Sequence, residues 1–322
     1  MIGLVLAAAL LLALVVDIRL GEPPVRWHPV VWMGNYLGWA GRRVAPTTAT
    51  AGPDYKSFSL AALMWCAGAA TVFVVAWFLQ KSILQLPTAL GAWPGGMLAA
   101  LLLGLLLKPL LAWAMLQREV LAVEASLAES LDAGRQRLAW LVSRDVAALT
   151  EGQVRESAIE SLAENLNDSV VAPIFWFVLL GLPGAALYRF ANTADAMWGY
   201  RGERNGRVWE WAGKWAAWVD DVLSWLPARI TGLLMLLVAG CFQWRVLVQQ
   251  ARLTPSPNSG WPMAAMALAL DVRLGKPGVY TLNPAGRLPL VADTQQAVTY
   301  ARNTLLALIP CAVVALYLVA IC

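Results

Sequence analysis

The sequence predicts an all-α, polytopic integral membrane protein with about five or six membrane segments and amphipathic helices at the membrane surface. Of its 322 residues, 59% are hydrophobic and only 14% are charged, and the mean hydropathy is +0.60. Its 17 tryptophans exceed what a soluble core of this size needs, and they suit the bilayer interface. These values place the chain among membrane proteins before any motif is considered.

The individual spans follow from apolar length, because a spanning helix needs about 20 apolar residues. Residues 2–16 are shorter than this, but we interpret them as a retained membrane helix rather than a signal peptide. No basic stretch precedes them, and Asp17, Ile18 and Arg19 follow where small residues would mark a cleavage site. The segments that meet the length requirement are residues 59–79, 95–116, 230–248 and 305–322.

Residues 170–190, "VVAPIFWFVLLGLPGAALYRF", permit two interpretations. The segment is long enough to span, yet "GLPG" divides it into halves that are too short to cross alone. It is therefore either a full span or a re-entrant hairpin covered by protein. The choice decides whether the polar stretches 117–169 and 191–228 lie on one side of the membrane. A third polar stretch covers residues 249–303.

Composition also excludes several classes of function. A net charge of +4 and a pI near 9.0 suit an anionic lipid or substrate, but no basic run with interleaved aromatics suggests nucleic acid. There is one histidine and no C-x-x-C pair, which argues against zinc catalysis and a disulfide framework. The cysteines lie in or at the ends of apolar segments: Cys66, Cys241, Cys311 and Cys322. Without a repeat or a low-complexity linker, we expect residues 1–322 to form a single membrane-embedded domain.

The first polar stretch contains clustered acids and reads as helical, including "LDAGRQRLAWLVSRDVAAL". In "RESAIESLAENLNDSVVAP", Glu156, Glu160, Glu164 and Asp168 recur every four residues and would share one helix face. Each like-charged neighbour pair costs about 0.2–0.5 kcal/mol, which a solvated helix tolerates. Because Asn165 and Asp168 lead directly into an apolar segment, the alternatives are Mg²⁺ or pairing with Arg155 or Arg144.

The second polar stretch contains "YRFANTADAMWGYRGERNGR". Asn192 and Asp195 are three residues apart and Gly199 follows at helical spacing, so a helix here would have a polar face open to a ligand. Arg201 and the arginines after it could bind phosphate or carboxylate. The alternative is a juxtamembrane basic loop that contacts lipid headgroups.

Further polar residues flank the next apolar segment. In "GKWAAWVDDVLSWLPARITG", Asp221 lies in an amphipathic helix that we expect to stop at Pro227. Arg229 stands at the mouth of the next span, either as a functional residue or as one that extends to the interface. Asn258 lies in "SPNSGWP", a predicted turn. No phosphate-binding glycine motif is present, so the residues alone fit equally an enzyme for an anionic substrate and a transporter.

Six collinear segments carry these residues: "DIRLGEPPVRWHPVVWMG", "LDAGRQRLAWLVSRDVAAL", "ESLAENLNDSVVAPIFW", "NTADAMWGYR", "GKWAAWVDDVLSWLPARITG" and "SPNSGWPMAAMALALDVRLG". In this order they resemble the CobD/CbiB family of cobalamin biosynthesis, the adenosylcobinamide-phosphate synthases. The resemblance covers nearly the whole chain, although residues 50–115 add only hydrophobicity. It implies a bacterial inner-membrane, multi-pass protein.

The resemblance also implies a reaction. The family joins cobyric acid, usually adenosylated, to (R)-1-aminopropan-2-ol or its O-phosphate through an amide bond on the f propionate of the corrin ring. Such a C–N ligase needs an activated carboxylate, so ATP and Mg²⁺ are expected cofactors. The expected partners are the corrinoid, the aminopropanol or its phosphate and the lipid bilayer, and self-association or association with other late B12 enzymes is left open.

By the same resemblance, the polar residues acquire expected roles. Catalytic roles fall to Glu164, Asp168 and His28. Magnesium ligands are expected among Glu164, Asp168, Asp195 and Asp221. Substrate contacts are expected at Arg144, Asn165, Asn192, Arg201, Arg229 and Asn258.

His28 is the one histidine of the chain, in "WHPVVWMG". The residues alone favour a structural role, because Pro29 fixes the turn and Trp27 and Trp32 suit the interface. The resemblance adds contact with the corrin or phosphate, or acceptance of the amine proton. Metal ligation by a lone imidazole is the weakest option.

A transporter or an AmpE-like membrane sensor is the alternative to the enzyme. A transporter would place charges in mid-span, often with repeat symmetry. Here the charges cluster at segment ends and no repeat is visible, which favours the enzyme.

Overall fold

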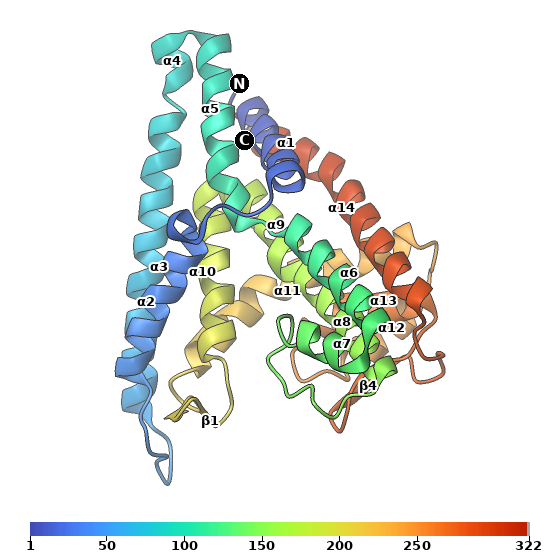
Figure 1. The fold of residues 1–322 in the computed structure, drawn as a ribbon. Coiled ribbons are helices and arrows are strands. Elements are labelled where there is room, and N and C mark those ends of the chain that lie inside the picture. The colour runs from blue at the N-terminus through green and yellow to red at the C-terminus, as the bar shows by residue number, and fades with distance from the viewer. Residues whose placement is uncertain (321–322) are drawn as a thin grey trace. The chain divides into compact units, whose positions relative to one another are not determined.

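A computed structural model describes residues 1–320, and within them most of the chain is helical (Figure 1). Cys322 and the end of the expected span 305–322 lie outside the described residues. The helices pack into two compact units built from interleaved segments. The first unit comprises Met1–Leu111, Ala172–Leu223 and Ala312–Cys322, and the second comprises Ala112–Val171 and Ser224–Cys311. The single-domain expectation stays a prediction.

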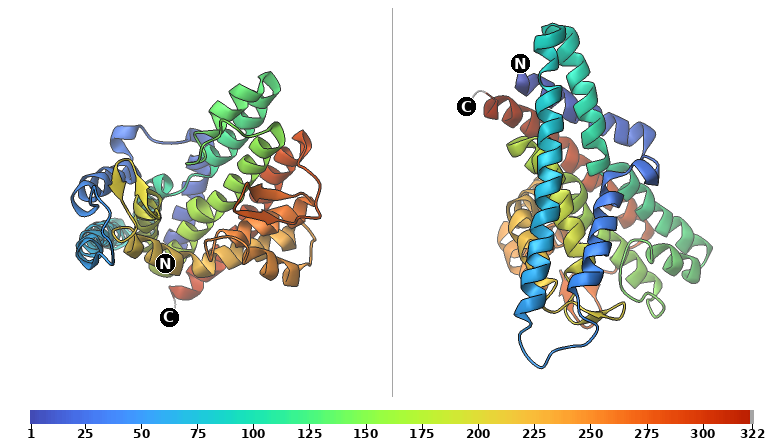
Figure 2. Two further views of the ribbon diagram at one scale, coloured as in Figure 1. Left: turned by 90° about the horizontal axis from the view of Figure 1, so that it is seen from below. Right: turned by 90° about the vertical axis from the view of Figure 1, so that its left-hand side faces the viewer.

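The first unit contains the N-terminal helices and the middle of the chain. Its elements are α1 (Ile2–Leu20), η1 (Val25–Trp27), α2 (Pro29–Val44), α3 (Tyr55–Ile83), α4 (Leu86–Leu90), α5 (Ala92–Leu107), η2 (Lys108–Leu110), α9 (Ala172–Leu180), α10 (Leu182–Trp198) and the hairpin β1–β2 (Glu203–Arg204, Arg207–Val208). It also holds the start of α11 (Lys214–Val238) and the end of α14 (Val291–Val319). Figure 2 (right) shows α3 and α5 joined through the short α4.

The second unit surrounds a buried central helix. Its elements are α6 (Trp113–Glu129), α7 (Leu131–Leu138), α8 (Glu151–Leu166), η3 (Asn167–Val171), α12 (Trp244–Ala251), α13 (Gly260–Leu270), the antiparallel hairpin β3–β4 (Leu274–Lys276, Tyr280–Leu282) and the larger parts of α11 and α14. The helix α8 packs against α6, α7, α13 and β3. It begins with a capping box between Thr150 and Gln153, which satisfies backbone donors that the first turn leaves open.

Small residues allow close packing in the first unit. A Cβ atom on Gly104 of α5 would lie 2.9 Å from the Ala9 carbonyl oxygen of α1, so these two helices meet backbone to backbone. A Cβ on Gly68 of α3 would lie 2.5 Å from Phe190 and Tyr36, which fill the space beside it. Membrane helices associate largely through such close contacts between small residues.

Five helical segments within residues 1–320 are long and apolar enough to cross a membrane. They are Ile2–Leu20, Tyr55–Leu90, Ala92–Glu129, Lys214–Val238 and Val291–Val319. The predicted fold class, all-α with about five or six membrane segments, is therefore confirmed. The predicted segments all overlap these five, apart from residues 170–190.

Residues 170–190 form two helices rather than one span. The helix α9 has nine residues, or about 14 Å, which is less than half of a bilayer core. Gly181 ends it with φ 70°, a conformation that glycine adopts without strain. The next helix, α10, packs back on α9, since a Cβ on Gly184 would lie 2.3 Å from the Trp176 carbonyl oxygen. The chain therefore turns at Gly181, and Gln80 of α3 holds this turn by accepting the Leu182 N–H at 2.7 Å. That the segment re-enters the membrane stays a prediction.

Three local predictions were wrong. The helix α11 does not stop at Pro227 but continues to Val238, where the predicted span 230–248 is cut short. Gly240, with φ 65°, follows the helix end, and a separate amphipathic helix, α12, begins at Trp244. The segment "LDAGRQRLAWLVSRDVAAL" is helical only as far as Leu138, because its second half forms turns that lead to the cap of α8. A proline within a helix costs one hydrogen bond but need not end the helix when packing supports it.

Candidate functional site

A buried lysine organises a charged cluster in the first unit. Nζ of Lys108 lies 3.3 Å from Oδ1 of Asp17 and 2.8 Å from Oε2 of Glu22. The same Glu22 oxygen lies 3.1 Å from Nε2 of His28. Lys108 and Asp17 are almost completely buried, so each charge depends on its partners for stabilisation.

Local structure explains how these four residues meet. Asp17 lies in the last turns of α1, and a loop with Pro23 and Pro24 carries the chain to His28, the residue before α2. Lys108 lies where α5 tightens into η2, next to Pro109.

Electrostatics favour the charged form of Glu22. Burial favours the neutral form of Glu22, but hydrogen bonds with His28 and Lys108 outweigh it and hold the Glu22 pKa below its ordinary value. Nδ1 of His28 is buried and has no hydrogen-bond partner within residues 1–320.

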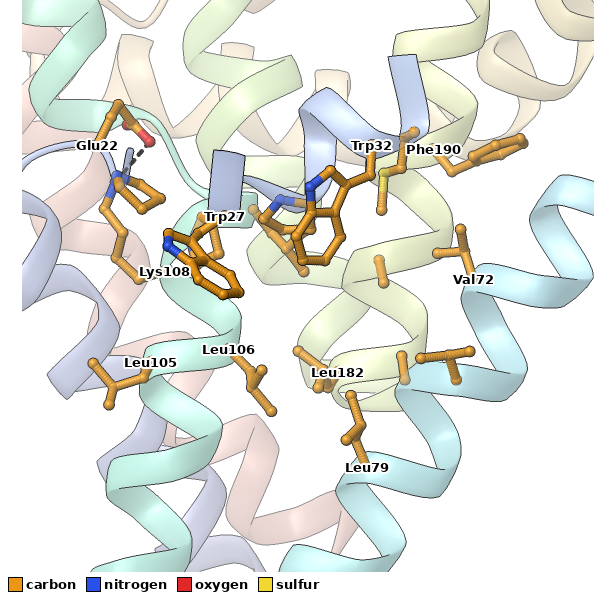
Figure 3. A pocket seen from close by; sticks show the side chains of 18 of the residues that line it. Glu22, Trp27, Trp32, Val72, Leu79, Leu105, Leu106, Lys108, Leu182 and Phe190 are labelled. Carbon is orange, nitrogen blue, oxygen red and sulfur yellow. Dashed lines mark ion pairs between the residues drawn. The ribbon is translucent and has the colours of Figure 1, made fainter. Parts of the chain in front are cut away.

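A cavity of about 780 Å³ adjoins this cluster within the first unit (Figure 3). In the figure, the ion pair between Glu22 and Lys108 lies at one edge, and the other labelled side chains around the cavity are apolar. They include Trp27, Trp32, Val72, Leu79, Leu105, Leu106, Leu182 and Phe190. Such a surface suits the apolar face of a large ligand, with polar recognition at one edge.

The arginine and acid motifs of the first unit come together only in part. Asn192 and Asp195 lie in α10 as expected, and Oδ1 of Asn192 is 3.5 Å from Nη1 of Arg189. Gly199 ends this helix, where a Cβ would lie 2.0 Å from Oδ1 of Asp195. Arg201, in the loop beyond, attracts Asp221 of α11 electrostatically.

The acidic face of α8 forms a second cluster, in the second unit. Glu156 and Glu160 are 3% and 4% exposed, so the alternative of a solvated helix face is wrong for them. Arg144, in the loop before α8, donates to the Ser157 hydroxyl and lies 3.4 Å from Glu160. Arg144 therefore pairs with this acidic face. Pairing with Arg144 was one of the alternatives that the sequence left open for these acids.

Burial changes the acidity of these groups. It raises the pKa of Glu160 to about 7, although Arg144 and a hydrogen bond with Tyr280 act in the opposite direction. Burial also raises the pKa of Glu156, against the attraction of Arg273 at 3.4 Å. Burial raises the pKa of Tyr280 too, and the nearby carboxylates Glu160 and Glu164 add to this effect.

Arg155 does not pair with the acidic face. Its guanidinium donates from Nε and Nη2 to the Glu124 carboxylate of α6, at 2.7–3.0 Å, and from Nη2 to Glu151 at 2.8 Å. The Thr294 hydroxyl of α14 also donates to Glu124, at 2.7 Å. Arg155 thus connects α8 to α6 within the second unit.

The end of α8 passes into a π-helical turn at Asn167–Val171. Nδ2 of Asn167 donates to Asp168 at 2.8 Å, and the Thr231 hydroxyl of α11 donates to Oδ1 of Asn167 at 3.1 Å. Asn165 donates to the Ser161 carbonyl oxygen at 2.9 Å. π-Helical turns occur often at functional sites, and this one places Asp168 outside the regular four-residue repeat of the acids before it.

Arg229 and Asn258 are brought together as direct partners. Nη1 of Arg229 donates to Oδ1 of Asn258 at 2.7 Å, and Nη2 donates to the Pro257 carbonyl oxygen at 3.1 Å. The guanidinium carbon also lies 4.4 Å and 4.8 Å from the ring centres of Trp225 and Trp261. These contacts hold the "SPNSGWP" turn against α11, and the substrate role expected for Arg229 stays a prediction.

Comparison with known proteins identifies the family. The family described as "CobD/Cbib protein" matches residues 10–309. The chain belongs to the CobD/CbiB family of cobalamin biosynthesis proteins.

Named relatives of this CobD/CbiB chain come from archaea and bacteria. A probable cobalamin biosynthesis protein CobD of Methanothermobacter thermautotrophicus is 42% identical over 85% of this chain and 86% of the relative. The cobalamin biosynthesis protein CobD of Chromobacterium violaceum is 41% identical over 82% of this chain and 80% of its own length. A probable CobD of Thermococcus kodakarensis is 40% identical over 89% and 88%. No solved structure matches.

The CobD/CbiB match spans every residue that the sequence analysis singled out for chemistry, in both units. Within the first unit, His28 joins the Lys108 cluster and Arg201 faces Asp221. Within the second unit, Arg229 meets Asn258. The catalytic, substrate and metal roles expected for these residues stay predictions.

Several polar residues of these clusters were missed. Lys108 could have been found from the sequence, because an ionisable residue inside an otherwise apolar stretch is a functional candidate by default. No feature of the sequence indicates a role for Arg273 or Tyr280, since their partners on α8 are far away in the sequence. Glu156 and Glu160 were seen as part of a stripe, but their burial was not foreseen.

The carboxylates of the chain are suitable ligands for magnesium, but they do not define a single binding site. Within residues 1–320, no three acidic, histidine or cysteine side chains gather to hold a metal ion. Mg²⁺ usually takes only one or two protein carboxylates and completes its shell with water and substrate phosphates. Glu164 and Asp168, both only partly buried beside the π-helical turn, fit that requirement by type and exposure.

Proposed function

We propose that this CobD/CbiB protein joins cobyric acid, in its adenosylated form, to (R)-1-aminopropan-2-ol or its O-phosphate. The product is adenosylcobinamide or its phosphate, with a new amide bond on the f propionate. The observation that carries the proposal is the family match across residues 10–309, which includes both charged clusters. The relatives' names give the pathway, and the chemistry of the substrates supplies the reaction type.

The bond changes follow from carboxylate chemistry. The propionate oxygen attacks the γ-phosphorus of ATP, which forms an acyl phosphate and releases ADP. The amine nitrogen then attacks the acyl carbon, the carbon–oxygen bond to phosphate breaks, and inorganic phosphate leaves. The nitrogen loses a proton to give the neutral amide. Each step needs positive charge near phosphate and an acceptor for the amine proton.

The residues of the chain can meet these needs. Glu164 and Asp168 would hold Mg²⁺, which shields phosphate charge when bound. Arg144 is a suitable phosphate ligand, because its guanidinium can form paired hydrogen bonds. Glu160, whose pKa is about 7, can accept a proton at neutral pH.

The first unit offers a place for the corrin. The large apolar cavity suits the methyl-bearing faces of the macrocycle, and His28, Glu22 and Lys108 at its edge suit polar side chains. We propose that the protein works in the cytoplasmic membrane, with the spans holding this cavity at bilayer depth. Association with other late B12 enzymes stays a prediction.

One assay tests the reaction. Purified protein is incubated with adenosylcobyric acid, (R)-1-aminopropan-2-ol O-phosphate and Mg-ATP, and the products are analysed by mass spectrometry. We expect an adduct of the two substrates minus one water, with equal amounts of ADP and phosphate. Corrinoid binding without any amide adduct would overturn the proposal and favour a transporter or sensor.

A further inference from the structure

A second cavity, of about 350 Å³, lies within the second unit between α8 and the β3–β4 hairpin. Glu156 and Gln153 of α8 line one side, and Arg273, Lys276 and Tyr280 line the other. Of these five residues, the sequence indicated only Glu156, as a member of the acidic face of α8. The cavity is polar, in contrast to the large apolar cavity of the first unit.

The charges around this cavity are unequal. Arg273 lies 3.4 Å from Glu156, Lys276 is exposed at the rim, and Arg144 lies 3.4 Å from Glu160 just beyond Tyr280. Of the charged side chains that line the cavity, Arg273 and Lys276 are cations and Glu156 is a carboxylate, so two positive charges face one negative charge. The net positive charge favours an anionic ligand.

The carboxylates define the inner end. Glu156 is held in place by Arg273 and by the backbone N–H of Gly275, so its carboxylate is oriented rather than free to turn. Farther along α8, Glu160 is 4% exposed and pairs with Arg144. An oriented carboxylate in a cavity wall is a suitable acceptor for an amine, which supplies up to three N–H groups.

The volume limits the ligand to a small molecule. Cavities that hold drug-sized ligands range from about 300 to 1,000 Å³, and this one lies near the lower limit. A compound of a few carbons with an amine at one end and a phosphate at the other matches both the size and the charges.

We propose that this cavity binds a small phosphorylated amine, with the phosphate on Lys276 and Arg273 and the amine on Glu156. The inference rests on the proposed function, in which (R)-1-aminopropan-2-ol O-phosphate is the nucleophile. It adds the place where that substrate binds and the residues that select its phosphorylated form over the free alcohol.

Steady-state kinetics test the phosphate end. We expect Lys276→Ala to raise the KM for the phosphorylated amino alcohol about tenfold, because a charge-assisted contact is lost. The KM for the free amino alcohol and for the corrinoid should change less than about twofold. Arg252→Ala is the matched control, since Arg252 is an exposed cation of the same unit outside the cavity. Arg273→Lys, which keeps the charge, should be milder than Arg273→Ala.

Calorimetric binding tests the amine end without turnover. The probes are (R)-1-aminopropan-2-ol O-phosphate, isopropyl phosphate, which lacks the amine, and ATP. Glu156→Gln should weaken binding of the first probe about tenfold and leave isopropyl phosphate unchanged or tighter. Lys276→Ala should weaken both phosphate monoesters but not ATP.

The outcomes separate the two proposals. If the wild-type protein makes amide and Lys276→Ala behaves like Arg252→Ala, the site is wrong while the proposed function stands. If the wild-type protein makes no amide, the proposed function fails, and the calorimetric titrations still decide the site. Weakening of ATP binding alone by Lys276→Ala would assign the cavity to a nucleotide and overturn the inference.

Discussion

Lys108 and Asp17 form an ion pair with almost no access to solvent: their exposed fractions are 3% and 0%, and Nζ lies 3.3 Å from Oδ1. Asp17 lies near the end of one apolar helix and Lys108 at the end of another, α5. The pair therefore ties α1 to α5 beside the large cavity of the first unit, and Glu22 and His28 extend it.

Removing one partner should destabilise the fold. Lys108→Met leaves the carboxylates of Asp17 and Glu22 without their cation, so we expect a loss of about 3–5 kcal/mol in the free energy of unfolding. The double variant Lys108→Met with Asp17→Leu should recover part of this loss, because no buried charge at position 17 remains. Thermal unfolding in detergent measures both. Equal stability of Lys108→Met and wild type would show that the pair contributes nothing.

A hydrogen bond from Trp176 should compensate for Pro227. Pro227 has no N–H, so the Leu223 carbonyl oxygen lacks its helical donor, and Nε1 of Trp176 donates to that oxygen at 3.0 Å. We expect Trp176→Phe to cost about 1–3 kcal/mol, since a carbonyl is left unsatisfied. In a Pro227→Ala background, which restores the N–H, the cost should fall by about 1 kcal/mol. An unchanged cost in that background would argue against this role.

Glu160 should make stability fall as pH rises. The folded state raises its pKa from 4.5 to about 7 because the group is buried, so the folded protein binds this proton more tightly than the unfolded chain. The resulting stabilisation is complete below about pH 4.5 and is lost as pH rises through about 7. The full effect is about 3 kcal/mol.

Thermal unfolding of wild type and Glu160→Gln at pH 5 and at pH 8 isolates the contribution of Glu160 to stability. Arg144, Tyr280 and Glu156 face Glu160, and the raised pKa of Glu156 acts in the same direction. Glu22 contributes little to this comparison, because its pKa is lowered from 4.5 and its effect on stability therefore lies below about pH 5. The Gln variant should lose most of the fall between the two pH values, and an identical pH profile would contradict the assignment.

Glu164 and Asp168 should be required for activity but not for insertion. Glu164→Ala or Asp168→Ala should reduce amide formation by at least about 100-fold if these side chains place Mg²⁺, while membrane insertion stays at the wild-type level. Product formation by mass spectrometry and membrane fractionation provide the two readouts. Full activity in both variants would exclude them as metal ligands.

Hydropathy predicted the spans well because each depends on a local run of apolar residues. All five candidate spans overlap predicted segments, and Gly181 was correctly suspected as a break in residues 170–190. Hydropathy failed at 230–248, because apolar character continues past Val238 while Gly240 and a new helix redirect the chain. Backbone turns of this kind depend on packing as much as on residue type.

The candidate site was predicted less completely, because its contacts join distant parts of the chain. Arg273 meets Glu156 from 117 positions away, and Thr294 meets Glu124 from 170 positions away. The positions of Arg273 and Thr294 in the sequence do not indicate which residues they contact. Arg229 shows what position alone leaves out: its substrate role stays a prediction, but its contacts with Asn258 and two tryptophans could not be foreseen from the sequence.

The sequence alone determined the membrane class, the helical content and the resemblance to the CobD/CbiB family, because composition, apolar length and motif order are properties of the linear chain. The tertiary structure decided which charges are buried and what they pair with. Lys108, Glu156 and Glu160 acquire their electrostatic character only when distant helices and the β3–β4 hairpin enclose them. Burial and pairing depend on three-dimensional neighbours, so no linear pattern could supply them.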